Sequence, residues 1–499
     1  MTFIEKADQL KPQLIHTDKK PISVVEVVEQ PSAFQGFGVK KLCDVSFPIT
    51  LKSGNSVILD FGEHVVGYVS FKLNFSGSIP DSPTRLSFLF GELPCEVYYP
   101  PEHATGGLKN WLQDDSRAYP FLPCEGRLER RYAFRYMKIT RTDNAKGFDI
   151  DLTNIVCDSV SAVSMDSVAP LKSADEQLTA IDRVSLNTLK ECMQEVFEDG
   201  PKRDRRLWIG DLRLEALTDY VTFKNIDIIK RCLYLFAGLT GQNGRVHPCL
   251  FENSYPFKPD YFLSDYSLIF IACLYDYAVY TGDKEFVEEL YPVAEAQFRY
   301  VCTMYDENKG MPSAGHIDWC IGLDKATPFE GIFLYTARQL AELAQMLGKD
   351  NRNILKTIAK VDRHMRSLKD LESGLIVSGE SRQLSSTSQV WAVLSGAFDE
   401  VECREILLKM DSFEFEYTMH SPYMYHYYVE ALYKAGLNDK AEEVIRNYWG
   451  KMVDLGADCF FEVFNPENER EAPYGDFVTN SACHAWSCTA SYWIRTKIV

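Results

Sequence analysis

The chain has 499 residues, of which 46% are hydrophobic and 25% charged, with a formal net charge of −18. This length exceeds one ordinary core and predicts two or three domains. The negative charge argues against nucleic-acid or anionic-membrane partners, because a polyanion would be repelled on average. No uncharged apolar run is long enough to span a bilayer.

The first third of the chain is predicted to be rich in β-strands. Runs of β-branched and aromatic residues, separated by Gly, Pro, Asn and Asp, continue to about residue 168. Two of them, 85–90 and 134–140, alternate polar with apolar residues, the period of a half-buried strand. The other runs lie at 23–28, 56–61 and 68–75. No helical period interrupts them, so we predict a β-sandwich domain over residues 1–168.

The pattern becomes helical after residue 168. Ser173-Ala174-Asp175-Glu176 predicts a capping box, and apolar residues then recur at three- and four-residue steps. Later apolar helices are predicted to end at glycines, at 266–281, 333–347 and 423–435. Helices apolar on most faces indicate two helical layers, so we predict an (α/α) barrel over residues 169–499. A helical solenoid is also compatible, but no fixed-period repeat supports it.

The loop Asp199–Asp211 stands between two predicted helices and concentrates charge. Its thirteen residues hold three carboxylates, four cations and one tryptophan. Carboxylates held by arginines beside an indole suit a sugar-binding cleft, because the ring covers the apolar face of a pyranose and the carboxylates bind its hydroxyls. The simpler alternative is a solvated loop of ion pairs.

Four later stretches repeat the combination of an acid or histidine with aromatic rings, at 260–266, 316–319, 458–466 and 481–486. A carboxylate among aromatic rings has a raised pKa, as a general acid needs. Glycoside cleavage requires two carboxyl groups, one to protonate the leaving oxygen and one to activate water. Each stretch also has a structural alternative: Asp265 as a helix N-terminal charge, Trp319 and Trp486 as core, His484 as a core or cap histidine, and Glu462 paired with Arg470.

Other chemistries have little support in the sequence. There is no Walker A, dinucleotide GxGxxG or GxSxG motif, and the nine histidines do not cluster. The fourteen cysteines form no CxxC pair and favour a reducing compartment over a disulfide scaffold. We therefore expect no metal and no cofactor. The N-terminus lacks signal-peptide features, so we expect a cytoplasmic protein, or a periplasmic one if a signal was removed.

The loop sequence DGPKRDRRLWIGD at 199–211 resembles the active-site loop of the α-L-rhamnosidases, glycoside hydrolase family 78. Asp318-Trp319, Phe461-Glu462 and His484-Ala485-Trp486 follow in that family's order, and residues 59–68 resemble its accessory β-sandwich. The resemblance covers most of the chain. It implies an (α/α)6 catalytic barrel preceded by a β-sandwich, and hydrolysis with inversion at the anomeric carbon.

The resemblance also implies roles for eight residues. Asp204 would be the general acid, and Glu462 the general base that activates water. Rhamnose would be bound by Asp199, Arg203 and Asp211 through its hydroxyls, by Trp208 against its ring, and by Trp319 and His484 at the rest of the pocket.

The sequence departs from the family's pattern at two points. Many members carry Glu as the acid in a loop one residue longer, reading Arg-Asp-Glu-Arg, whereas here Asp204 is followed by Arg205. The family's usual C-terminal β-domain is also missing, since the chain stops soon after Trp493. A partner subunit in a homo-oligomer could then cover one end of the barrel.

We therefore expect an exo-acting glycosidase that removes terminal α-L-rhamnose, or a related L- or deoxy sugar, from glycosides or oligosaccharides. The expected partner is a carbohydrate, not a nucleic acid or a membrane. Two alternatives stay open. One is a carbohydrate-binding protein on a catalytically impaired scaffold, and the other is a different (α/α)-barrel enzyme, such as a lyase or a phosphorylase.

Overall fold

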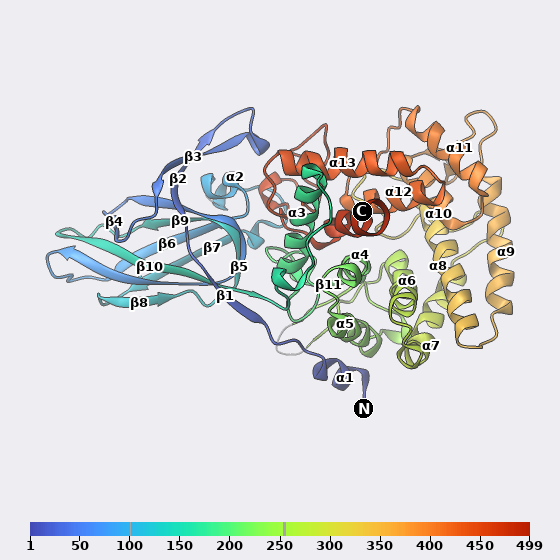
Figure 1. The fold of residues 1–499 in the computed structure, drawn as a ribbon, viewed down its shortest axis with the longest axis horizontal. Helices are drawn as coiled ribbons and strands as arrows, with labels where there is room; N and C mark the ends of the chain where they lie inside the picture. The colour runs from blue at the N-terminus through green and yellow to red at the C-terminus, as the bar shows by residue number, and fades with distance from the viewer. Residues whose placement is uncertain (100, 253–255) are drawn as a thin grey trace.

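The computed structural model has a strand-rich part followed by a helical part, at the left and right of Figure 1. It describes residues 1–99, 101–252 and 256–499. This order confirms the expected fold class, a β-sandwich followed by an (α/α)6 barrel. Within the described ranges, no helix combines the length and apolarity that crossing a bilayer requires.

The strand-rich part is organised around β5 (Ser56–Gly77), a strand of 22 residues. Two separate strands were predicted here, and that prediction was wrong. The pairing of β5 with its neighbour shifts register between Asp60 and Val65, which marks a β-bulge. Gly62 adopts a φ of +80° inside this interval, so it accommodates an irregularity within one strand and does not end it.

The other strands pair with β5 or extend the same sheet antiparallel. β9 (Tyr132–Arg141), β10 (Phe148–Ser161), β2 (Ser23–Glu29) and β8 (Cys124–Arg127) pair with β5 directly. The sheet continues through β6 (Thr84–Gly91), β7 (Gln113–Tyr119), β3 (Phe37–Asp44), β1 (Ile15–Lys19) and β4 (Ile49–Leu51). Alternate side chains of the long strands form one apolar core that includes Leu59, Phe71 and Phe134.

The inner layer of the barrel is a closed ring of helices. Its members are α4 (Ile209–Val221), α6 (Ser264–Thr281), α8 (Ala326–Met346), α10 (Ser386–Ser395), α12 (Pro422–Lys434), and the 3₁₀ segment η7 (Ala485–Thr489) that leads into α14 (Ala490–Trp493). Each contacts the next, and η7 returns to α4. The inner helices are buried on most faces, and every residue of α10 is buried.

The outer layer alternates with the inner one along the chain. It consists of α3 (Glu176–Cys192), α5 (Ile226–Gly238), α7 (Lys284–Cys302), α9 (Arg352–Ser367), α11 (Glu400–Asp411) and α13 (Asn438–Asp454). Most of these helices, namely α7, α9, α11 and α13, bury one face, whereas α3 and α5 are buried more widely. In α9 the buried residues Ile354, Ile358, Val361 and Met365 recur at three- and four-residue steps. Apolar periodicity therefore distinguishes the two layers.

The helix ends differ in detail from the predictions. α6 ends at Gly282 in the left-handed conformation, as predicted. The predicted capping box is wrong, because Asp175 is the N-cap of α3 and accepts a hydrogen bond from the N–H of Leu178 at 2.9 Å. α8 begins well before the predicted Phe333, since Pro328 is tolerated in a first helical turn.

Several contacts join the two parts. The helix α1 (Phe3–Gln9) lies against α5, away from the sheet (Figure 1). Arg135 of β9 bonds Asp60 at 3.0 Å and Asp458 of the helical part at 2.8 Å. The last strand of the sheet, β10, ends at Ser161 and α3 begins at Glu176. The domain boundary between residues 168 and 169 stays a prediction.

Candidate active site

A cavity of about 360 Å³ opens where the loops that precede the inner helices meet the strand-rich part. All eight residues singled out from the sequence line it: Asp199, Arg203, Asp204, Trp208, Asp211, Trp319, Glu462 and His484. These residues come from the segments before α4, α8 and η7, from the first turn of α4 and from the segment after α13. The fold thus gathers them into one site, from chain positions up to 285 residues apart.

Asp199 shapes the loop that carries the other acids. Its two carboxylate oxygens accept hydrogen bonds from the backbone N–H of Arg206 at 3.0 Å and of Asp204 at 3.3 Å. Its carbonyl accepts from the N–H of Ala485 at 2.7 Å, which joins the loop to η7. Burial and the neighbouring Asp204 raise the pKa of Asp199 well above its ordinary value. A protonated Asp199 would also have a proton to donate.

Arg205, the residue that departs from the family pattern, is directed to the strand-rich part. Its guanidinium donates to the carbonyl of Pro201 and to that of Arg131, each at 2.6 Å. Its φ of +64° turns the backbone between residues 204 and 206. Asp204 therefore faces the cavity, where its carboxylate lies 3.2 Å from the guanidinium of Arg206.

The second acid, Glu462, is held by three groups. Arg203 donates to one of its oxygens, the hydroxyl of Tyr474 donates to the other at 2.6 Å, and the N–H of Ser481 approaches at 3.4 Å. The Arg203 guanidinium also lies 3.8 Å from the Asp204 carboxylate and 4.0 Å from the centre of the Tyr474 ring. One guanidinium thus stands between the two acids and orients both.

The environments of the two acids push their pKa values apart. Burial raises the pKa of Asp204 above its ordinary value, although Arg206 and Arg203 oppose the shift. Burial would likewise raise the pKa of Glu462, but Arg203 and the Tyr474 hydroxyl outweigh it and lower that pKa. Such a pair favours one protonated and one ionised carboxyl group in the same cavity.

Asp211 and His484 form a second polar pair in the cavity wall. His484 Nδ1 lies 3.5 Å from the carboxylate of Asp211, in the first turn of α4. Burial lowers the pKa of His484 to about 3 and raises that of Asp211 well above its ordinary value. A neutral imidazole beside a protonated carboxyl group offers both donors and acceptors to a neutral ligand.

Several buried polar atoms at the cavity have no hydrogen-bond partner among the residues that the structure describes. They are Nε1 of Trp208 and Trp319, Nε2 of His316 and Nε of Arg206. Nδ1 of His484 and Oδ1 of Asp211 also belong to this set, because they lie 3.5 Å apart without forming a hydrogen bond of normal geometry. Unpaired buried polar groups are costly and therefore rare. Their concentration in one cavity indicates a ligand rich in hydroxyl groups, whose donors and acceptors would pair with them.

Aromatic side chains form much of the remaining wall. Trp208 packs edge-on against Tyr266 at 6.1 Å, and Trp319 against Tyr474 at 5.1 Å. Trp111, at the end of the 3₁₀ segment η3 (Lys109–Trp111), reaches the cavity from the strand-rich part. Apolar faces beside unpaired polar atoms suit a sugar ring.

Neighbouring residues position the lining. Asp265 accepts hydrogen bonds from the backbone N–H groups of His316 and Ile317, at 2.8 and 2.9 Å. Asp318 accepts from the N–H of His420 at 2.8 Å and from the Ser421 hydroxyl, at the start of α12.

Two of the structural alternatives for these stretches are not observed in the protein. The pair Glu462–Arg470 does not form, because Arg470 donates to the carbonyl of Gln35 instead. Trp319 is only partly buried and lines the cavity, so it is not plain core.

Eight further residues line the cavity and were not predicted from the sequence to belong to the site. They are Leu108, Trp111, Arg206, Leu263, Tyr266, His316, Tyr474 and Trp486. Arg206, Leu263, Tyr266, His316 and Trp486 belong to stretches whose composition had drawn attention. Tyr474 lies in a loop, and Trp111 in the other part of the molecule, and neither carried a local signal.

An (α/α)6 barrel with two carboxyl groups lining one sugar-sized cavity is the arrangement of a glycosidase. The match to family models is specific. The glycosyl hydrolase family 78 α-rhamnosidase N-terminal domain matches residues 21–159, and the bacterial α-L-rhamnosidase six-hairpin glycosidase domain matches residues 166–498. The chain belongs to the α-L-rhamnosidases of glycoside hydrolase family 78.

Solved structures agree with this assignment. A rhamnosidase from Klebsiella oxytoca, solved with rhamnose bound, is 38% identical with a TM-score of 0.97, and the match covers 100% of this chain and 98% of that one. A family 78 rhamnosidase from Bacillus sp. GL1 has the same fold at 21% identity and a TM-score of 0.79, over 92% of this chain and 49% of that one. A comparison with curated proteins found no match.

Proposed function

We propose that the protein is an exo-acting α-L-rhamnosidase that inverts the anomeric centre, with Asp204 as general acid and Glu462 as general base. One observation carries the proposal: the two carboxyl groups line the same cavity, and their surroundings shift their pKa values in opposite directions. General acid–base catalysis at a glycosidic bond requires this division.

The chemistry follows from the two protonation states. Asp204, protonated, donates its proton to the glycosidic oxygen as the bond to the anomeric carbon breaks. Glu462, ionised, removes a proton from a water molecule that attacks the same carbon from the opposite face. Arg203 keeps Glu462 ionised, and the Tyr474 hydroxyl orients it. One water is consumed, and the sugar leaves with inverted configuration.

The cavity also supports a single terminal sugar as ligand. Its volume of about 360 Å³ is near the lower end of small-molecule sites. The unpaired atoms on Trp208, Trp319 and His484 would bond its hydroxyls, and the indole faces would cover its apolar side. Rhamnose is the sugar we propose, because the Klebsiella relative at 38% identity was solved with rhamnose bound.

A panel of aryl glycosides tests the proposal. Release of a poor leaving group, such as unsubstituted phenol, from an α-L-rhamnoside, at a rate that Asp204→Asn and Glu462→Gln each reduce by about 10²–10⁴-fold, supports it. Unchanged turnover by either variant overturns the assignment of roles. If rhamnose raises the melting temperature but no glycoside is cleaved, the protein is a binding protein. Product formation that depends on added phosphate indicates a phosphorylase.

A further inference from the structure

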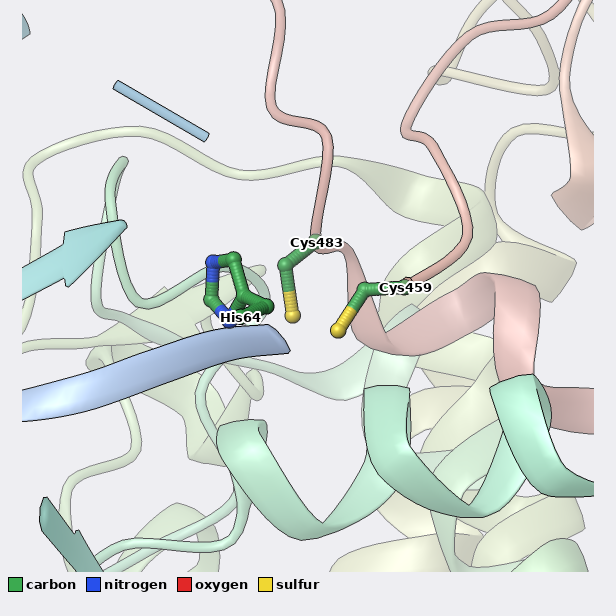
Figure 2. Close-up of side chains that lie close together, drawn as sticks. All are labelled: His64, Cys459 and Cys483. Atoms are coloured by element: carbon green, nitrogen blue, oxygen red, sulfur yellow. The ribbon is translucent and has the colours of Figure 1, made fainter. Parts of the chain in front are cut away.

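Three side chains that could bind a metal ion meet at the junction of the two parts of the molecule. They are His64 of β5 and, from loops of the helical part, Cys459 and Cys483 (Figure 2). One potential ligand atom from each lies within 4.8 Å of the others, and all three residues are buried. No metal was expected from the sequence, because these residues are far apart in the chain and form no spacing motif.

His64 is oriented as a metal-binding histidine would be, with its second ring nitrogen next to a carboxylate. Nε2 lies 3.1 Å from a carboxylate oxygen of Glu92. Nδ1 is buried and has no hydrogen-bond partner of normal geometry within the described part of the chain. Histidines that bind metals commonly donate their other N–H to a carboxylate, which fixes the ring and its tautomer. The other oxygen of Glu92 accepts from the N–H of Ala482 at 2.6 Å, so Glu92 is itself fixed.

A fourth sulfur and a supporting amide complete the surroundings. Cys192 Sγ lies 3.9 Å from Cys483 Sγ. Two thiolates on one tetrahedral zinc ion are roughly 3.8 Å apart, given Zn–S bonds of about 2.3 Å. The side-chain N–H of Asn187 reaches Cys459 Sγ at 3.5 Å, a contact that would stabilise a metal-bound thiolate. A cavity of about 230 Å³, lined by His64, Glu92 and Cys459, gives an ion a route inward.

We propose that His64 Nδ1, Cys459 Sγ and Cys483 Sγ bind one zinc ion. Cys192 Sγ lies outside this group of mutually close ligand atoms but 3.9 Å from Cys483 Sγ, and it would move toward the ion to become the fourth ligand. Nitrogen and sulfur donors in a tetrahedral arrangement select zinc over calcium or magnesium. Binding releases the proton of each thiol that becomes a thiolate ligand.

A zinc ion here would link three segments that build the sugar site. Cys459 lies three residues before Glu462, and Cys483 directly precedes His484. His64 belongs to the strand-rich part. The ion would therefore fix both cavity loops to each other and to β5, as a structural and not a catalytic centre. Four closed ligand positions are typical of structural zinc sites.

Metal analysis of the full-length, tag-free protein tests the proposal. Protein purified under reducing conditions with added zinc and then desalted is expected to hold one zinc ion per chain by mass spectrometry. His64→Gln and Cys459→Ser are expected to lose it. The matched control Cys273→Ser, which changes a buried cysteine inside α6, is expected to retain it. Glu92→Gln is expected to weaken zinc binding by about 10–100-fold, as loss of a supporting carboxylate does elsewhere.

Cobalt substitution tests the ligands without any variant. Wild-type protein titrated with Co²⁺ is expected to develop the thiolate-to-cobalt charge-transfer band and the visible bands of a tetrahedral site, saturating at one ion per chain. Added zinc should abolish both. Wild-type protein that holds no zinc after desalting and gives no thiolate band with cobalt overturns the proposal, whatever the variants do. Both readouts are independent of the sugar that the protein cleaves.

Discussion

Arg203 donates a hydrogen bond to the carboxylate of Glu462, and the same guanidinium lies 3.8 Å from the carboxylate of Asp204. Arg203 lowers the pKa of both acids, and burial raises the pKa of both. The net result is a raised pKa for Asp204 and a lowered pKa for Glu462. The difference arises because the Tyr474 hydroxyl and a direct ion pair with Arg203 stabilise the charge on Glu462. The opposite pKa shifts of the two acids therefore depend on local contacts.

Replacing Glu462 by Gln is expected to lower kcat by at least about 100-fold, because no general base then remains to activate the attacking water. Sugar binding should survive, since Gln keeps the shape of the side chain. The measurement is steady-state hydrolysis of an aryl rhamnoside together with the rhamnose-induced shift in melting temperature. Glu467→Gln, an exposed residue of the same loop, is the matched control and should behave as wild type.

Replacing Asp204 by Asn is expected to give a loss that depends on the leaving group. An activated nitrophenolate leaves without a proton, so its release should fall far less than that of an alkyl alcohol, which needs one. Comparing kcat/KM for the two substrates measures the difference. Equal losses on both substrates would contradict a general-acid role for Asp204. Asp260→Asn, an exposed carboxylate in the loop before α6, is the control.

Replacing Arg203 by Gln is expected to move the pH–rate profile to higher pH. Removing a cation destabilises both carboxylates, so the pKa of Glu462 and that of Asp204 should each rise, by roughly 1–3 units. The acid limb, where Glu462 must be ionised, and the alkaline limb, where Asp204 must be protonated, then shift in the same direction. Arg446→Gln removes one charge at Asp175 and Glu442 and should leave the profile unchanged.

Lys202 connects the loop at 199–211 to the strand-rich part, and we expect its replacement to destabilise the fold. It is buried and lies 2.9 Å from the carboxylate of Glu96 in α2 (Pro94–Tyr98). Lys202→Met is expected to lower the free energy of unfolding by about 3–5 kcal/mol, since it leaves Glu96 buried without a cation. Urea unfolding measures this, and Lys202→Met with Glu96→Gln should recover part of the loss.

The loss of stability in Lys202→Met should also depend on pH, in a direction that follows from the pKa of Glu96. Burial raises the pKa of Glu96 to about 7, against the opposing effect of Lys202. Without Lys202 that pKa should rise further, so the folded state binds a proton that the unfolded state releases. The deficit of Lys202→Met relative to wild type should therefore grow as pH rises above about 7 and level off at a smaller value below that pH. A deficit that is constant with pH would contradict this account.

Much of the fold followed from periodicity. The two-residue alternation of 85–90 and 134–140 belongs to β6 and β9, and the stripe in α9 against the uniformly apolar α6 separates the barrel layers. The prediction that one strand ends before residue 68 was wrong, because Gly62 lies in a bulge inside β5. Whether such a glycine ends a strand or lies in a bulge depends on the pairing of neighbouring strands.

The site was predictable where the chain concentrates its chemistry in one stretch. The loop at 199–211 and the acid–aromatic stretches supplied all eight proposed residues, which line one cavity. Trp111 was missed because it reaches the cavity from a different domain, and contacts across domains leave no local pattern. His64, Cys459 and Cys483 were missed for the same reason, since tertiary folding alone brings them within ligand distance.

The configuration of the first sugar released tests the central claim most directly, namely that Asp204 and Glu462 act from opposite faces of the anomeric carbon. Proton NMR of an aryl α-L-rhamnoside with wild-type enzyme, followed from the first minutes, resolves the two anomers before they equilibrate. The account predicts that β-L-rhamnose appears first and the α anomer later by mutarotation. Initial release of α-L-rhamnose, or no release at all, would contradict it.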